Sequence, residues 1–190
     1  MHAEIMKDSS REHSDVLEKL SLAVGLLEES LDVRLIPPHG AKFAYAKAGA
    51  REPDGVAAVR GGIIDNQGKA HAAGPGAYGA DADIARIVLT TMKFDPRMRS
   101  AATLRFSRNI LPVLANLLLE YRSFDLSLEP PGITTMDWGV ASCCKEGVPD
   151  VCYDCGRKGK EGLIYLFGEK PIDVVNNIIM ISNRIITIEL

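Results

Sequence analysis

Apolar residues recur along this chain at two alternating spacings, one typical of helices and the other of strands. Over residues 10–30 they fall on one helical face between charged residues, which predicts an amphipathic helix with a serine near its start. A second helix is expected over residues 81–93, ending before Pro96, because proline cannot continue a helix. Later helices are expected over residues 109–121, with Pro112 in the first turn, and over 134–144 and 171–185. The helix over 134–144 is expected to have Thr134 or Thr135 as its cap and Asp137 at its positive N-terminal end.

Short runs of small, β-branched and aromatic residues between the helices predict strands. Residues 34–46 indicate a strand, a Pro-Pro-His-Gly turn and a second strand, and residues 56–64 indicate a third. Further strands are expected near residues 102–107, 122–124, 148–154 and 163–168, the last two around a loop at 155–162. Because helices and strands alternate throughout, the sequence predicts one α/β domain over residues 1–190, with a sheet covered by helices.

The stretch GPGAYG, residues 74–79, has the glycine spacing of a dinucleotide-binding loop. Such a loop follows a buried apolar strand, and an acidic residue ends the next strand about twenty residues later. Here the preceding segment is KAHAA, and the downstream Asp95 lies in the helix-ending FDP. We therefore interpret the stretch as flexible backbone entering a helix. Asp81 and Asp83 then either cap that helix or bridge to a phosphate through Mg²⁺.

Composition narrows the class of protein. The 190 residues are 46% hydrophobic and 25% charged, with a formal net charge of −3, values typical of a soluble globular protein. The acidic balance argues against direct nucleic-acid binding, which calls for a basic face. The polar N-terminus is no signal peptide, and no apolar run could cross a membrane, so we expect a cytoplasmic protein with reduced thiols.

A cluster of cysteines raises the question of a metal site. Zinc binding is one interpretation and a redox pair another, but free thiols are preferred. Cys143 and Cys144 are adjacent and would point in different directions, and a strand that extends to Asp154 would hold Cys152 and Cys155 well apart. We expect His39 and His71 on the surface, since neither has a second ligand at a metal spacing. Trp138 either stacks on a pyrimidine ring or packs in the core. The cysteines are Cys143, Cys144, Cys152 and Cys155.

Several phrases, read in order, resemble the ThiN-type thiamine-phosphate synthase domain. They are VAAVRGGI, MKFDP, the RSAATLRFS stretch, FDLSLEPP, MDWG and PDVCYDCGRKGKE, and the match runs from about Lys42 to Met180. The resemblance implies a three-layer α/β/α sandwich related to the class II aldolase/epimerase (AraD-like) domains, and a homodimer. It also implies an activity that joins hydroxymethylpyrimidine pyrophosphate to a thiazole phosphate with release of pyrophosphate.

The same domain occurs fused to a pyrimidine kinase, and behind a DNA-binding helix-turn-helix as a sensor of thiamine phosphate. Residues 1–40 offer one helix and one lead-in strand, so we expect neither partner module here. The pattern of the family implies a catalytic arginine at Gly62, a histidine at Asp83 and a further arginine at Leu126. All three side chains are missing. Arg60, on the same strand face as residue 62, could supply the missing guanidinium.

The remaining candidates fit a binding site better than a catalytic one. Cations are expected to hold phosphate, and carboxylates to meet a thiazolium, a pyrimidine amine or Mg²⁺. We expect no tightly bound cofactor, and at most Mg²⁺ carried in with a phosphate ligand. The candidates are Arg60, Gly79, Asp81, Lys93, Arg99, Arg105, Asp125, Glu129, Asp154, Lys160 and Glu161.

The sequence therefore predicts a ThiN-like domain that binds thiamine phosphate or its precursors, with synthase activity lost or much reduced. One alternative is a working synthase that uses Arg60 or Mg²⁺ in place of the missing groups. Another is a sugar-phosphate aldolase or epimerase on the same fold, although the metal-binding histidine cluster of that chemistry is not visible.

Overall fold

The computed structural model describes residues 2–132 and 136–185, with side chains from residue 10 onward. Seven strands form one sheet in the order β5-β2-β1-β6-β9-β8-β7, antiparallel except for the β7–β8 pair. Their bounds are β1 (Phe43–Ala46), β2 (Val56–Val59), β5 (Gly76–Tyr78), β6 (Ser100–Arg105), β7 (Tyr121–Ser123), β8 (Val151–Arg157) and β9 (Lys160–Gly168). A separate hairpin pairs β3 (Ile63–Asn66) with β4 (Lys69–Ala72).

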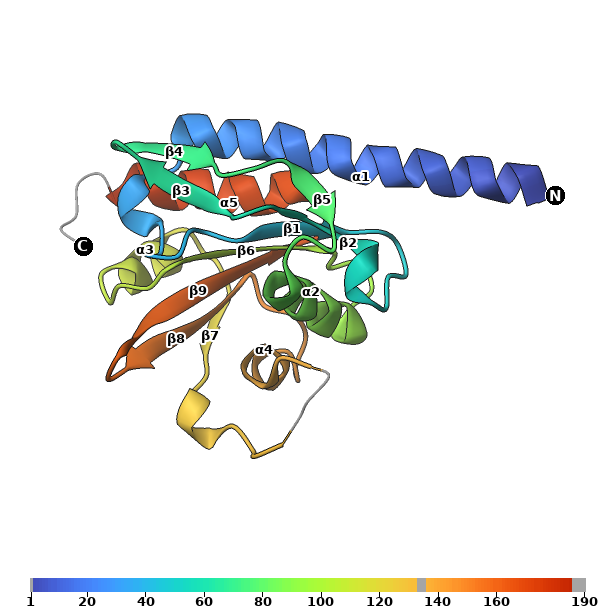
Figure 1. Ribbon diagram of the computed structural model, residues 1–190. Coiled ribbons are helices and arrows are strands. Elements are labelled where there is room, and N and C mark those ends of the chain that lie inside the picture. Colours follow the sequence, from blue (N-terminus) through green and yellow to red (C-terminus); the bar gives the residue numbers. More distant parts are fainter. Residues whose placement is uncertain (1, 133–135, 186–190) are drawn as a thin grey trace.

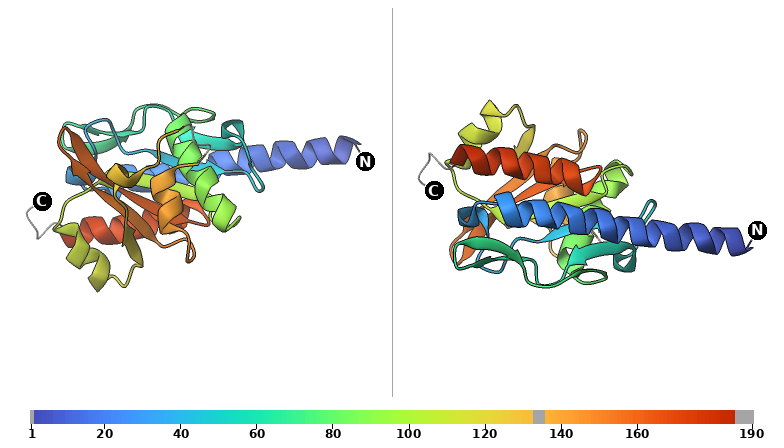
Figure 2. Two further views of the ribbon diagram at one scale, coloured as in Figure 1. Left: turned by 90° about the horizontal axis from the view of Figure 1, so that it is seen from below. Right: turned by 90° about the horizontal axis from the view of Figure 1, so that it is seen from above.

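Helices cover both faces of this sheet, as Figure 1 shows. On one face α1 (His2–Ser30) and α5 (Pro171–Ile185) lie side by side, with α3 (Ile110–Asn116) against α5 (Figure 2). On the other face α2 (Ala82–Phe94) packs against α4 (Trp138–Cys143). The three-layer α/β/α arrangement predicted from the sequence is confirmed.

Alternation along the central strands divides the core between the two faces. In β1, Phe43 and Tyr45 join the cluster under α1 and α5, whereas Ala44 and Ala46 join the cluster under α2. This is the period of two expected of a strand buried on both sides. The alanines leave little side-chain volume under α2, so its N-terminal end can lie close to the sheet, where the cavity described below is found.

The segment before β1 differs from the prediction. Instead of a lead-in strand it forms a 3-10 helix, Val33–Leu35, because the carboxylate of Asp32 accepts a hydrogen bond from the backbone N–H of Arg34 at 2.9 Å. The first helix also begins at His2, well before the serine expected near its start. Amphipathic spacing located the helix from residue 10 onward but not where it begins.

Three other differences from the predicted strands lie in glycine-containing segments. Residues 56–64 are not one strand, because Arg60–Gly62 form a turn in which Gly61 and Gly62 have φ of +75° and +72°. Residues 76–78 of the GPGAYG stretch form the edge strand β5, which pairs with β2. The expected loop at 155–162 is largely paired as well, since β8 and β9 extend to the turn at Lys158 and Gly159.

Candidate functional site

A cavity of about 350 Å³ lies on the α2/α4 face of the sheet. Its floor includes Thr103 of β6 and Leu163 and Tyr165 of β9, and its walls come from α2, from the segment around Phe124 and from the start of α4. The charged side chains that line it are equally divided between three cations and three carboxylates. They are Lys42, Arg86, Lys160, Asp83, Glu129 and Asp137.

The N-terminus of α2 forms one corner of the cavity. Asp81 is its N-cap and accepts hydrogen bonds from the backbone N–H groups of Asp83 and Ile84 at 3.0 and 3.2 Å. These two bonds satisfy donors that a helix start leaves without intrahelical partners. The cap therefore fixes where the helix begins and turns the side chain of Asp83 toward the cavity.

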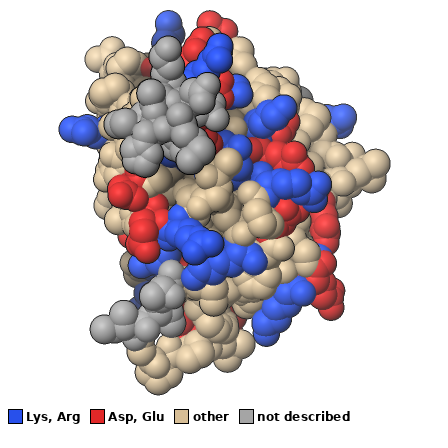
Figure 3. Space-filling view, turned by 90° about the vertical axis from the view of Figure 1, so that its right-hand side faces the viewer, with Lys and Arg blue, Asp and Glu red and all other residues tan. Residues whose placement is uncertain are grey.

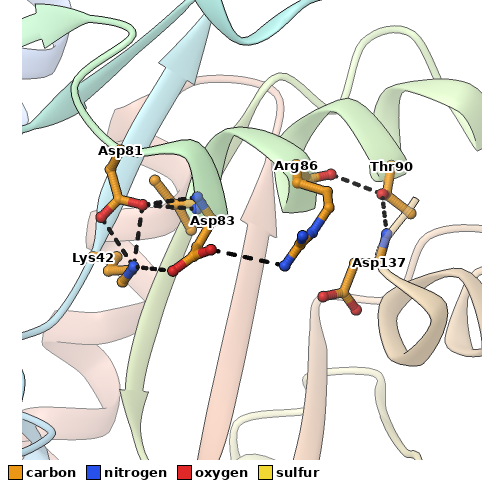
Figure 4. A network of polar contacts seen from close by, with 7 residues as sticks. Lys42, Asp81, Asp83, Arg86, Thr90 and Asp137 are labelled. Carbon is orange, nitrogen blue, oxygen red and sulfur yellow. Dashed lines mark hydrogen bonds and ion pairs between the residues drawn. The ribbon is translucent and has the colours of Figure 1, made fainter. Parts of the chain in front are cut away.

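Lys42 reaches this corner from the residue before β1. Its ammonium donates to the carboxylate of Asp83 at 2.9 Å and to that of Asp81 at 3.1 Å (Figure 4). Its backbone N–H donates to the Thr103 hydroxyl at 2.9 Å. Because Lys42 continues the alternation of β1, its side chain leaves the strand on the same face as Ala44, the face that α2 covers.

These contacts shift the proton affinities of the groups involved. Desolvation of the half-buried ammonium lowers the pKa of Lys42, but the hydrogen bonds that it donates to Asp83 and Asp81 outweigh this effect, and the net pKa lies above its ordinary value. The hydrogen bond from Lys42 in turn lowers the pKa of Asp83. At neutral pH residue 83 is therefore a carboxylate that accepts hydrogen bonds and has no proton to donate.

Helix α2 connects Arg86, another cation of the lining, with the start of α4 on the other side of the cavity. Arg86 lies one turn after Asp83, and their side chains approach to 3.8 Å. The buried hydroxyl of Thr90 donates to the carbonyl oxygen of Arg86 at 2.7 Å and accepts from the backbone N–H of Asp137 at 3.0 Å. Asp137 caps α4 by accepting a hydrogen bond from the backbone N–H of Val140 at 2.9 Å. One hydroxyl thus ties α2 to the beginning of α4.

We predict that replacing Thr90 with valine destabilises the fold by about 1–3 kcal/mol, since the partly buried N–H of Asp137 loses its acceptor. Thr90→Ser keeps the hydroxyl and is the matched control, expected to lose less. Urea denaturation measures both free energies of unfolding. Equal losses in the two variants would show that the hydroxyl does not hold α4 in place.

Aromatic and apolar side chains complete the cavity. Phe124 packs at a tilt on Tyr165, with ring centroids 5.7 Å apart, and burial raises the pKa of the Tyr165 hydroxyl. Gly139 of α4 allows this arrangement, because a Cβ at that position would lie 2.3 Å from the Phe124 ring. The site therefore offers flat apolar surface beside groups of both charges.

The structure brings some of the predicted site residues to this cavity. Asp83, Glu129 and Lys160 line the cavity. Asp81 is not in the lining but forms an ion pair with Lys42, which is. Arg105 and Glu161 are not in this lining: they pair with each other at 3.1 Å, and Arg105 lines a separate cavity with Arg34. Leu126, where the family pattern implies an arginine, is also in the lining.

Other predicted residues lie outside the lining. Lys93 is in the last turn of α2, at the end opposite to Asp83. Figure 3 shows a face of the molecule on which basic and acidic side chains are intermixed. Arg99 stacks its guanidinium over Tyr45, which belongs to the α1/α5 side of the sheet. Asp125 caps the 3-10 helix Leu126–Leu128, and Asp154 accepts from the backbone of a residue in its own strand. Gly79 is a left-handed residue in the turn before α2, also outside the lining.

The expectation that Arg60 shares a strand face with residue 62 is wrong, because both lie in the turn after β2. The Arg60 side chain packs at Gly74, where a Cβ would meet its Cβ at 3.2 Å, and it is not in the cavity lining. At Gly62 a Cβ would lie 2.8 Å from the carbonyl oxygen of Ala41. With its positive φ, this position is shaped for glycine.

Sequence reasoning missed Lys42, Arg86 and Thr90, and took Asp137 only as a helix-terminal charge. Lys42 had a usable signal, since it is the polar residue next to an apolar strand at the position whose side chain faces α2. The helix cap at Asp137 also differs from the expected Thr134 or Thr135, two residues that lie outside the described part of the chain.

The cysteines do not assemble a metal site. Cys143, Cys144 and Cys152 are buried and Cys155 is exposed, and within residues 2–132 and 136–185 no group of three histidine, cysteine or acidic residues could hold a metal ion.

His39 is exposed, and His71 lies 3.1 Å from Glu28 on an exposed surface. Trp138 is half-buried and outside the cavity lining. The described helices are all too short or too polar to cross a membrane.

The fold and the cavity together define a class: a three-layer α/β/α domain with a cavity of mixed charge beside the start of one helix. A distant structural match agrees on the fold. YgbL from Escherichia coli, of the aldolase/epimerase/decarboxylase type, superimposes with a TM-score of 0.50 at 13% identity over 94% of this chain and 91% of its own.

The chain belongs to the ThiN family, because the thiamine-phosphate synthase ThiN model matches residues 19–180. It is 34% identical over 170 residues to the bifunctional thiamine biosynthesis protein ThiDN of Methanocaldococcus jannaschii, covering 88% of this chain and 40% of that protein. It is 30% identical over 176 residues to the thiamine-phosphate synthase ThiN of Methanothermobacter thermautotrophicus, covering 88% of this chain and 93% of that one.

Solved structures give the same relationship. The C-terminal domain of protein MJ0236 matches with a TM-score of 0.86 at 34% identity, over 93% of this chain and 98% of that one. The C-terminal domain of a phosphomethylpyrimidine kinase matches with a TM-score of 0.82 at 33% identity, over 89% and 99% of the two chains.

Proposed function

We propose that the cavity between α2 and α4 binds thiamine phosphate or one of its pyrimidine or thiazole phosphate precursors. The observation that carries the proposal is the lining of three cations and three carboxylates around aromatic and apolar surface. Thiamine phosphate is a zwitterion with a phosphate, a thiazolium cation and two flat rings. Lys42, Arg86 and Lys160 suit the phosphate, while Glu129 and Asp137 suit the cation and the pyrimidine amine.

We further propose that synthase activity is lost or much reduced. The family pattern implies an arginine at residue 62 and a histidine at residue 83 for the departure of pyrophosphate. Gly62 has no side chain and Asp83 is an ionised acceptor, so neither stabilises the negative charge on the leaving group. Mg²⁺ bound by a pyrophosphate ligand would not replace both groups. A domain that binds without turnover would act as a sensor of thiamine phosphate.

Two measurements on the purified protein test this function. Calorimetric titration with thiamine phosphate should show saturable binding near one ligand per chain. Incubation with both precursors and Mg²⁺ should give turnover at least about 100-fold below that of the Methanothermobacter thermautotrophicus synthase, the scale of losing one charge-stabilising donor. Turnover comparable to that enzyme would overturn the loss of activity, and an absence of binding would overturn the ligand.

A further inference from the structure

The carboxylate of Asp83 lies against the cations that an anionic ligand group would be expected to bind. This carboxylate contacts two of the three cations that line the cavity, Lys42 at 2.9 Å and Arg86 at 3.8 Å. The two cations come from different elements and converge on this one carboxylate (Figure 4). The phosphate of a ligand would find the same two cations at this place, because both line the cavity.

The neighbouring carboxylate of Asp81 has a different role. Asp81 accepts two backbone hydrogen bonds that start α2, and only 20% of its side chain is exposed. The Asp83 side chain is 67% exposed and forms ion pairs with Lys42 and Arg86, and the charge of Lys160 also acts on its carboxylate. Asp83 is therefore dispensable to the helix cap but directly opposed to an anion at Lys42 and Arg86.

We infer that Asp83 is an internal stand-in for an anionic ligand group and sets the charge preference of the site. While it occupies Lys42 and Arg86, the lining carries no surplus positive charge. A ligand that brings its own cation, such as a thiazolium phosphate, is then favoured over a bare polyanion such as pyrophosphate. This inference rests on the proposed function only in taking the cavity as the ligand site.

Inorganic pyrophosphate is the probe that tests the inference. Asp83→Asn keeps the shape of the side chain and removes its charge. It should bind pyrophosphate at least about tenfold more tightly than the unaltered protein, since a like charge within about 4 Å of the anion is lost. The control is Asp15→Asn on α1, which removes the same charge from an exposed ion pair with Lys19 and should leave the affinity unchanged. Adding Lys42→Met to Asp83→Asn should abolish the gain.

Equal affinity of Asp83→Asn and the unaltered protein for pyrophosphate would overturn the inference. So would an equal gain in Asp15→Asn, or a gain that survives Lys42→Met. Thiamine phosphate is titrated into the same proteins. Binding of thiamine phosphate without the pyrophosphate gain would leave the proposed function standing and this inference refuted. A pyrophosphate gain without thiamine phosphate binding would support the stand-in role and refute the proposed ligand.

Discussion

Lys42→Met is expected to weaken the binding of thiamine phosphate by about 10- to 100-fold, the effect of losing a hydrogen bond to a charged group of about 1.5–3 kcal/mol. The substitution keeps the apolar stem of the side chain and removes only the ammonium. Two carboxylates, Asp81 and Asp83, would then face the cavity without their shared cation. Both the lost contact and the added repulsion act against a phosphate.

The matched control is Lys19→Met, because Lys19 is also an ion-paired lysine, bound to Asp15 on α1 across the sheet from the cavity. Calorimetric titration of both variants measures the affinity, and circular dichroism checks that both are folded. Equal affinity in the two variants would show that the ligand does not use the corner formed by Lys42.

Gly162→Ala should be among the most destabilising single-methyl changes in the chain. A Cβ at residue 162 would lie 2.3 Å from the carbonyl oxygen of Asp154 and 2.7 Å from the carbonyl carbon of Cys155. Both are backbone atoms of the paired strand β8, so no side chain can move aside. Overpacking of this kind costs about 3 kcal/mol, and in a chain of this size each kcal/mol lowers Tm by about 2–4 °C.

Gly25→Ala makes the same chemical change with the opposite expected sign. Gly25 lies within α1 with nothing within 4 Å of an added Cβ, and alanine is favoured over glycine in a helix by about 0.5–1 kcal/mol. Thermal unfolding of the two variants beside the unaltered protein measures both effects. A Gly162→Ala variant as stable as Gly25→Ala would contradict the close approach of β8 and β9.

Helices with a regular spacing of apolar residues could be predicted from the sequence. The spacing of apolar residues located α2 and α5 to within a residue at each end, and Pro96 marked where α2 stops. Elements that depend on one turn were not located. The carboxylate of Asp32 starts a 3-10 helix where strand-like residues stand, and the left-handed Gly61 and Gly62 divide a strand-like run in two.

The site shows the same division. Family resemblance drew attention to Asp83, and the glycine-flanked loop to Lys160, both of which line the cavity. Lys42 could not be connected with Asp83 from local pattern, because the two are 41 residues apart and meet only when β1 and α2 pack. Lys93 shows the converse, since it lies on the same helix as Asp83 but in the last turn, outside the cavity lining.

A crystal structure of the protein with thiamine phosphate would show whether this ligand occupies the cavity between α2 and α4. We expect its phosphate within hydrogen-bonding distance of Lys42 and Arg86, the carboxylate of Asp83 displaced from them, and the thiazolium facing Asp137 or Glu129. Thiamine phosphate bound at another surface, with the contact between Lys42 and Asp83 intact, would contradict this expectation.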